Sequence, residues 1–203
     1  MKKTSKILIL FFTLLISVGS NAQLVYQDLG DLKMLGNQTK LMVKYDYSEM
    51  MMSEGSTEAV YLDKMRKQLN ESVPGKGDEF IASWESYKKE GWPYKFEELW
   101  NKYFGKLNLS QSNTDAAYTL TVKTLVVFPG QFSSGGIGAI PAWITCEFII
   151  TETNKPDVIL SKSTIKHVQG GAMCSVANSG MCVEGAFAKI AKSFTEHIKK
   201  NKK

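Results

Sequence analysis

The chain has 203 residues, of which 43% are hydrophobic, 22% charged and 11% aromatic, with 16 glycines, 5 prolines and 3 cysteines. This composition excludes a disordered tail, a collagen-like fibre and a small disulfide scaffold, and the length suits one domain with a buried core. The formal net charge is +5 at pH 7, with lysines concentrated at both ends of the chain.

The first 22 residues have the pattern of a secretory signal peptide. Three lysines precede an apolar run over residues 7–16, and small residues lead up to Ala22, as a signal peptidase requires. The run is too short to cross roughly 30 Å of hydrocarbon. We therefore expect cleavage after Ala22, which leaves residues 23–203 as a single domain with a short basic C-terminal tail.

Loss of the signal segment lowers the net charge of the chain. Lys plus Arg falls from 25 to 22 against 20 acids, so the formal charge falls from +5 to +2. Four of the remaining lysines lie in the last five residues, which marks a frayed end rather than a basic face, and we expect no nucleic-acid partner.

No cysteine lies near the cut, so we expect a soluble periplasmic or extracellular protein without a lipid anchor. No later stretch reaches the ~18 apolar residues of a membrane span.

The first half of the domain is predicted to contain strands and then three helices. Residues 39–47 alternate between apolar and polar side chains, which predicts a strand with one buried face. Residues 24–35 are expected to supply its partner through a turn at residues 36–37. Each helix has one apolar stripe and ends at a glycine or a Pro-Gly pair. The helices are expected over residues 57–73, 78–91 and 93–105.

The second half returns to a period of two. Three strands are predicted, and the last two form a hairpin. They cover residues 118–128, 143–152 and 158–168. Loops rich in Gly, Ser and Ala follow the first and last of them, at residues 131–139 and 169–182. A closing helix begins near residue 183. This order predicts an α+β fold, with a mostly antiparallel sheet of about four to five strands and helices packed on one face.

The search for catalytic motifs is mostly negative. The sequence has no Walker, H-E-x-x-H, G-x-S-x-G, C-x-x-C or Rossmann glycine pattern. It has two histidines, His167 and His197, and no spacing ties either one to a catalytic partner. We predict no cofactor and no metal site, and we favour a binding protein over an enzyme.

The three cysteines differ in their surroundings. Cys146 alternates in phase with apolar neighbours, which predicts a buried thiol. Cys174 and Cys182 bracket a short loop, and such cysteines commonly pair outside the cytoplasm, so a disulfide is predicted. An alternative stays open, in which this loop serves a thiol-dependent hydrolase with His167 as base, or binds copper through its thiols and the adjacent methionines.

Aromatic residues are dense between residues 84 and 104, which include three of the four tryptophans. Most of them fall on the predicted apolar stripes and are expected in the core. Trp92 and Tyr94 flank a proline at what we expect to be an exposed turn between helices, where such rings can stack on sugars or anchor a partner protein. Together with Gln131 and Phe132 in the first glycine-rich loop, they form the predicted recognition surface.

Several segments of the chain resemble a family of small secreted Bacteroidetes proteins of unknown function. The resemblance rests on Phe96-Glu97-Glu98-Leu99, Ala117-Tyr118-Thr119-Leu120-Thr121-Val122, Glu152-Thr153-Asn154-Lys155-Pro156, Ala186-Phe187-Ala188-Lys189-Ile190 and the signal ending in Ala22-Gln23. It implies fold and export. The order of elements is distantly similar to envelope accessory domains, such as penicillin-binding-protein activators and auxiliary subunits of transporters.

These observations together predict an exported, non-catalytic binding or accessory module of the cell envelope. Its partner is expected to be an envelope protein, a peptide or a glycan. Neither the identity of that partner nor an oligomeric state follows from the sequence.

Overall fold

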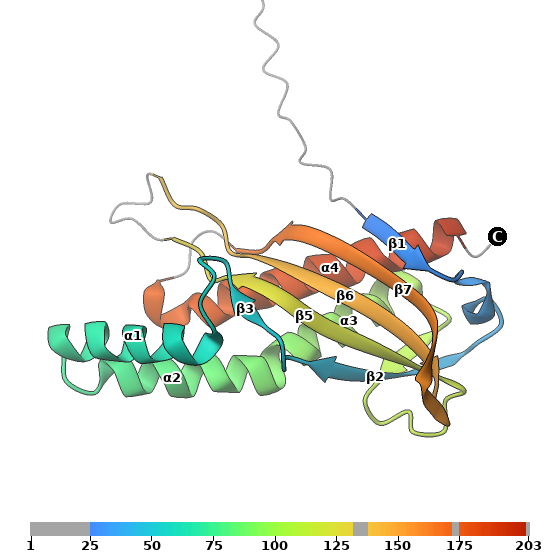
Figure 1. Ribbon diagram of the computed structural model, residues 1–203, viewed down its shortest axis with the longest axis horizontal. Coiled ribbons are helices and arrows are strands. Elements are labelled where there is room, and N and C mark those ends of the chain that lie inside the picture. Colours follow the sequence, from blue (N-terminus) through green and yellow to red (C-terminus); the bar gives the residue numbers. More distant parts are fainter. Residues whose placement is uncertain (1–24, 132–137, 172–174, 202–203) are drawn as a thin grey trace, which may run out of the picture.

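The computed structural model describes residues 25–131, 138–171 and 175–201, and a mixed sheet forms its centre (Figure 1). The strand order across the sheet is β1-β7-β6-β5-β2-β4, and β3 pairs with the end of β5. The strands are β1 (Val25–Leu29), β2 (Lys40–Asp46), β3 (Met51–Met52), β4 (Asn108–Ser110), β5 (Tyr118–Phe128), β6 (Trp143–Glu152) and β7 (Lys155–Gln169).

Antiparallel pairing dominates the long strands. β5, β6 and β7 follow one another as a meander, and β1 pairs antiparallel with β7. The predicted α+β class and mostly antiparallel sheet are therefore confirmed, and the short strands β3 and β4 add to the five longer ones. β2 runs parallel to β5, because three helices cross over between the two strands.

One predicted strand pair is wrong. The segment before residue 36 does not turn back onto β2, because residues 33–35 form a short helix and β1 pairs with β7 instead. Alternation within a strand shows which side chains are buried, but it carries no information about the neighbouring strand.

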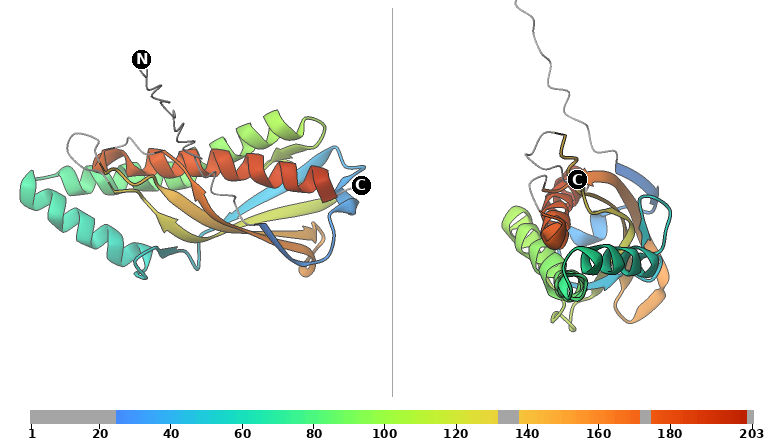
Figure 2. Two further views of the ribbon diagram at one scale, coloured as in Figure 1. Left: turned by 90° about the horizontal axis from the view of Figure 1, so that it is seen from above. Right: turned by 90° about the vertical axis from the view of Figure 1, so that its left-hand side faces the viewer.

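The helices form two groups. α3 (Trp92–Phe104) and α4 (Ser179–Asn201) lie side by side over one face of the sheet, whereas α1 (Glu58–Ser72) and α2 (Lys76–Ser86) form a hairpin that extends past its end (Figures 1 and 2). No helix among the described residues is both long enough and apolar enough to cross a membrane.

The predicted turn between the second and third helices does not exist. α2 continues through a π-helical segment, η2 (Tyr87–Gly91), directly into α3, with helical backbone angles at Gly91 and Trp92. Pro93 has no backbone N–H, and its ring clashes with the carbonyl group one turn earlier in a regular helix. The wider π turn accommodates the proline without ending the helix.

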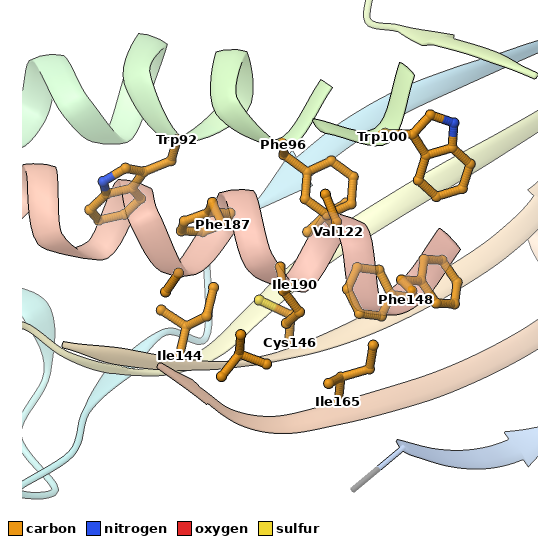
Figure 3. Close-up of a cluster of buried hydrophobic side chains, with 14 of the residues drawn as sticks. Trp92, Phe96, Trp100, Val122, Ile144, Cys146, Phe148, Ile165, Phe187 and Ile190 are labelled. Carbon is orange, nitrogen blue, oxygen red and sulfur yellow. The ribbon is translucent and has the colours of Figure 1, made fainter. Parts of the chain in front are cut away.

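The core lies between α3, α4 and the sheet (Figure 3). Trp92 of α3 stacks on Phe187 of α4 at 5.2 Å between ring centroids. Phe148 of β6 stacks on Phe194 of α4 at 4.0 Å. The expectation that most of the aromatic cluster builds the core is confirmed, because Trp84, Trp92 and Trp100 are all at most 1% exposed.

Candidate functional site

A pocket of about 300 Å³ opens at the end of the sheet where β5 leaves for the first glycine-rich loop. We call it the loop-end pocket. Three segments that are far apart in the sequence line it. The lining residues are Glu54, Tyr61, Met65, Gln68, Phe128, Pro129, Gly130, Gln131, Val176 and Ser179.

Local sequence explains how the lining is assembled. Tyr61, Met65 and Gln68 are spaced four and three residues apart, so they lie on one face of α1. Thr57 caps this helix by accepting a hydrogen bond from the N–H of Val60 at 3.4 Å. β5 ends at Phe128, just before Pro129, and Gly130 adopts a positive φ of 94°, a conformation that favours glycine. Sequence reasoning missed Tyr61 and Gln68, although their helical spacing marks a shared face.

The hydroxyl of Ser179 is the most informative polar group of the pocket. Ser179 is 1% exposed, and its Oγ has no hydrogen-bond partner among the described residues. Its interaction with the Tyr61 phenol works against the rise in the pKa of Tyr61, but the pair does not meet the geometry of a formed hydrogen bond. Buried hydroxyl groups are normally paired, so an unpaired one that lines a pocket points to a missing partner.

The electrostatics of the pocket are neutral to acidic. Burial, followed by the nearby Glu54 charge, raises the pKa of Tyr61 to about 12, so the phenol keeps its proton and can donate a hydrogen bond. No lysine or arginine is among the lining residues that the structure describes. The pocket therefore offers hydroxyl and amide hydrogen bonds, one carboxylate and apolar walls.

Phe128 is the first of three aromatic rings that contact one another in a row. Phe128 packs against Trp143 with 5.9 Å between ring centroids, and Trp143 stacks on His167 at 4.1 Å. His167 has a φ of 58°, which is rare for a residue other than glycine. It lies in a bulge opposite Thr145, whose Oγ1 accepts a hydrogen bond from the His167 backbone N–H at 3.2 Å. The bulge holds the ring over Trp143 in a strained backbone conformation.

The structure separates the four residues predicted for recognition. Trp92 is 0% exposed and its Nε1 donates to the Gly180 carbonyl at 2.9 Å, so its expected place on an exposed turn is wrong. Tyr94 is 62% exposed on α3. Gln131 is exposed at the loop-end pocket, and Phe132 lies outside the described residues. Binding roles for Tyr94, Gln131 and Phe132 stay predictions.

The cysteines give no assembled thiol site among the described residues. Cys146 is a free thiol, and burial raises its pKa to about 12, which suppresses the reactive thiolate. Cys182 is fully buried near the start of α4. Cys174 lies outside the described residues, so its disulfide with Cys182 and the hydrolase and copper alternatives stay predictions. Within the described ranges, no group of three or more His, Cys, Asp or Glu side chains could hold a metal ion.

A second pocket, of about 410 Å³, lies at the other end of β5, and we call it the far-end pocket. Asp115 and Glu152 contribute carboxylates to its lining, and Thr153 contributes a hydroxyl. Lys40 pairs with Asp115 at 2.7 Å, and Lys155 pairs with Glu152 at 2.8 Å. These polar groups already have partners within the protein.

Comparison with solved structures finds a distant likeness. No protein-family model matches the chain, and a search of curated proteins finds no relative. The chain is similar in structure to PelC. A PelC dodecamer from Paraburkholderia phytofirmans aligns with a TM-score of 0.37 and 12% identity, over 83% of this chain and 96% of the PelC chain. A dodecamer of a point variant of the same PelC aligns with a TM-score of 0.35 and 10% identity, over 84% and 96%. Likeness to PelC at this level carries no argument about function.

Proposed function

We propose that this chain is an exported binding module of the cell envelope, which acts without catalysis and takes its ligand or partner at the loop-end pocket. One observation carries the proposal. The pocket brings together three distant segments around the hydroxyl of Ser179, which is buried and has no hydrogen-bond partner among the described residues. Leaving such a hydroxyl unpaired costs about 1–3 kcal/mol, and a bound molecule that supplies the partner recovers that cost.

Export is the first half of the proposal. It is supported by the basic, apolar and small-residue pattern of the first 22 residues. The test is mass spectrometry of the chain recovered from the periplasm and from the medium of a diderm bacterium. We expect a mature N-terminus at Gln23. A full-length chain found with the cytoplasmic fraction would contradict export.

The second half places binding at the loop-end pocket, and site-directed photo-crosslinking tests it. Gln131 is exposed at the pocket, and Asp157 is exposed on the β6–β7 hairpin at the other end of the sheet. Each residue is replaced in turn by a photoreactive benzoylphenylalanine, and the cells are irradiated. We expect a discrete crosslinked species from position 131 and none from position 157. Equal crosslinking from both positions, or none from 131, would contradict the proposed site.

A further inference from the structure

We infer that the loop-end pocket binds a neutral sugar ring. In this assignment, Phe128 forms an apolar wall, and the hydroxyls of Tyr61 and Ser179 and the amides of Gln68 and Gln131 supply the hydrogen bonds. The inference rests on the proposed function and adds the chemical class of the ligand.

The lining has the two kinds of surface that a pyranose presents. A sugar ring has apolar C–H faces and a rim of hydroxyl groups that both donate and accept hydrogen bonds. The pocket provides apolar surface through Met65, Phe128 and Pro129. Amide and hydroxyl groups, which also donate and accept, lie around this surface.

Charge argues against an anionic ligand. A phosphate or carboxylate is usually held by lysine or arginine, and neither type is found in the described part of the pocket lining. The carboxylate of Glu54 lies in the lining and would repel such a group. The same carboxylate can accept hydrogen bonds from the hydroxyls of a neutral sugar.

The buried hydroxyl argues against a purely apolar ligand. Ser179 Oγ is already shielded from water in the ligand-free chain, and an acyl chain or an aliphatic side chain would offer it no hydrogen bond. Burial of an unpaired hydroxyl is unfavourable, and an apolar ligand leaves this cost in place whereas a hydroxylated one recovers it. A neutral, polyhydroxylated ring satisfies both the charge and the hydrogen-bonding requirement.

Trp143 and His167 act as positioning residues for the Phe128 wall. Phe128 packs on Trp143, which stacks on His167, and the positive φ of His167 places its ring in this row. A side chain supported by a second layer keeps a fixed orientation, which a ring-stacking contact requires.

The pocket volume of about 300 Å³ lies at the lower end of the range for ligand sites. We therefore expect one ring of an oligosaccharide to enter it.

Calorimetric titration of the mature chain tests the inference. The probes are cellotetraose, maltotetraose and N-acetylchitotetraose, with tetragalacturonate and decanoate as an anionic and an apolar comparison. We expect saturable binding of at least one neutral probe and of neither comparison ligand. Ser179→Ala should weaken that binding by about tenfold, because the variant cannot supply the hydrogen bond.

Ser163→Ala is the matched control for Ser179→Ala. Ser163 also has a buried Oγ without a partner among the described residues, but it lies on β7 and does not line the pocket. Ser163→Ala should leave the affinity unchanged. Tyr94→Ala removes the exposed ring of the recognition surface that the sequence predicts, and it therefore separates that surface from the loop-end pocket. If Tyr94→Ala abolishes binding while Ser179→Ala does not, the assignment to this pocket is wrong.

The positioning role needs its own variants. His167→Asn keeps a residue that tolerates positive φ but removes the ring, and we expect it to weaken sugar binding about threefold. His167→Phe should restore most of the affinity, because it returns a stacking ring. A purely structural role of His167 would make both variants equal to the parent in affinity once each is shown to be folded by circular dichroism.

The outcomes separate this inference from the proposed function. Failure of all three neutral probes, with crosslinking from position 131 retained, overturns the sugar assignment and leaves the binding module in place. Saturable binding of tetragalacturonate or decanoate in competition with a neutral probe also overturns it. Failure of both titration and crosslinking overturns the two proposals together.

Discussion

The two ends of the sheet carry pockets that differ in what their polar groups contact. At the far end, Asp115 and Glu152 pair with lysines, and the hydroxyls of Thr119 and Thr153 lie 3.0 Å apart in a hydrogen bond. At the loop end, the Ser179 hydroxyl is buried without a partner among the described residues. The far-end pocket is the larger of the two, at about 410 Å³ against about 300 Å³. This contrast in unsatisfied hydrogen-bonding capacity, and not the volume, is why the loop-end pocket is the proposed binding site.

The largest expected effect tests how the loop end is anchored. The buried Trp92 indole donates to the carbonyl of Gly180, which adjoins Ser179. Trp92→Ala removes this bond and leaves a cavity in the core, so we expect a loss of about 3–5 kcal/mol in the free energy of unfolding, measured by urea denaturation. Trp92→Phe keeps a ring but loses the bond and should cost less. A loss below about 1 kcal/mol for Trp92→Ala would show that the anchor is unimportant.

The next prediction concerns the unpartnered hydroxyls in the ligand-free chain. Ser179→Ala removes the desolvation penalty of a buried oxygen, so we expect the free energy of unfolding to rise by about 1 kcal/mol. Ser163→Ala should give a similar rise, because its Oγ is also buried and has no partner within the described ranges. Thermal denaturation in the absence of ligand measures both changes. A destabilisation by Ser179→Ala would mean that this hydroxyl has a structural partner, and the contrast between the two ends would fail.

The third prediction concerns backbone strain at the loop end. Both His167→Ala and His167→Gly remove the ring, but glycine adopts the observed φ of 58° without steric cost. We expect the glycine variant to be more stable than the alanine variant by about 1 kcal/mol, which reverses the usual order of the two residues in a strand. Equal stabilities, or a more stable alanine variant, would show that His167 is not strained.

The smallest expected effect on stability concerns the ion pair of Lys40 and Asp115 at the far-end pocket. A hydrogen bond from Lys40, together with its charge, lowers the pKa of Asp115 from the ordinary value of 3.8. Because the folded-state pKa lies below the unfolded one, the stabilisation is present above that ordinary value and is lost as the pH falls through the folded pKa. We expect Lys40→Ala to have a small effect at neutral pH, since both side chains are exposed. It should also flatten the acid side of the stability curve, and an unchanged acid side would contradict the pairing.

Local patterns predicted most elements of the fold. The alternating segments at residues 118–128 and 143–152 became β5 and β6 with the same bounds, because side-chain alternation is a property of each strand alone. The pairing of β1 with β7 joins residues more than 130 positions apart (Tyr26 with Thr164, for example), and no local signal encodes it. The break expected at Pro93 was wrong because a π turn can absorb a proline inside a continuous helix.

The sequence predicts only part of the candidate site. Gln131 was singled out by the glycine-rich loop that begins there, and it lies at the loop-end pocket. Ser179 was assigned to the second loop, and nothing in the sequence marked its hydroxyl as unpaired. Its significance depends on how α1, the end of β5 and the start of α4 come together in three dimensions.

The most direct test of the central claim is a residue-resolved titration. A ¹H–¹⁵N correlation spectrum of the mature chain, titrated with the neutral tetrasaccharide that binds most tightly in calorimetry, reports both pockets at once. We predict concentration-dependent shifts at Tyr61, Gln68, Gln131 and Ser179 and none at residues 114–118 or 152–154. Shifts confined to the far-end residues, or no shifts at all, would contradict the account.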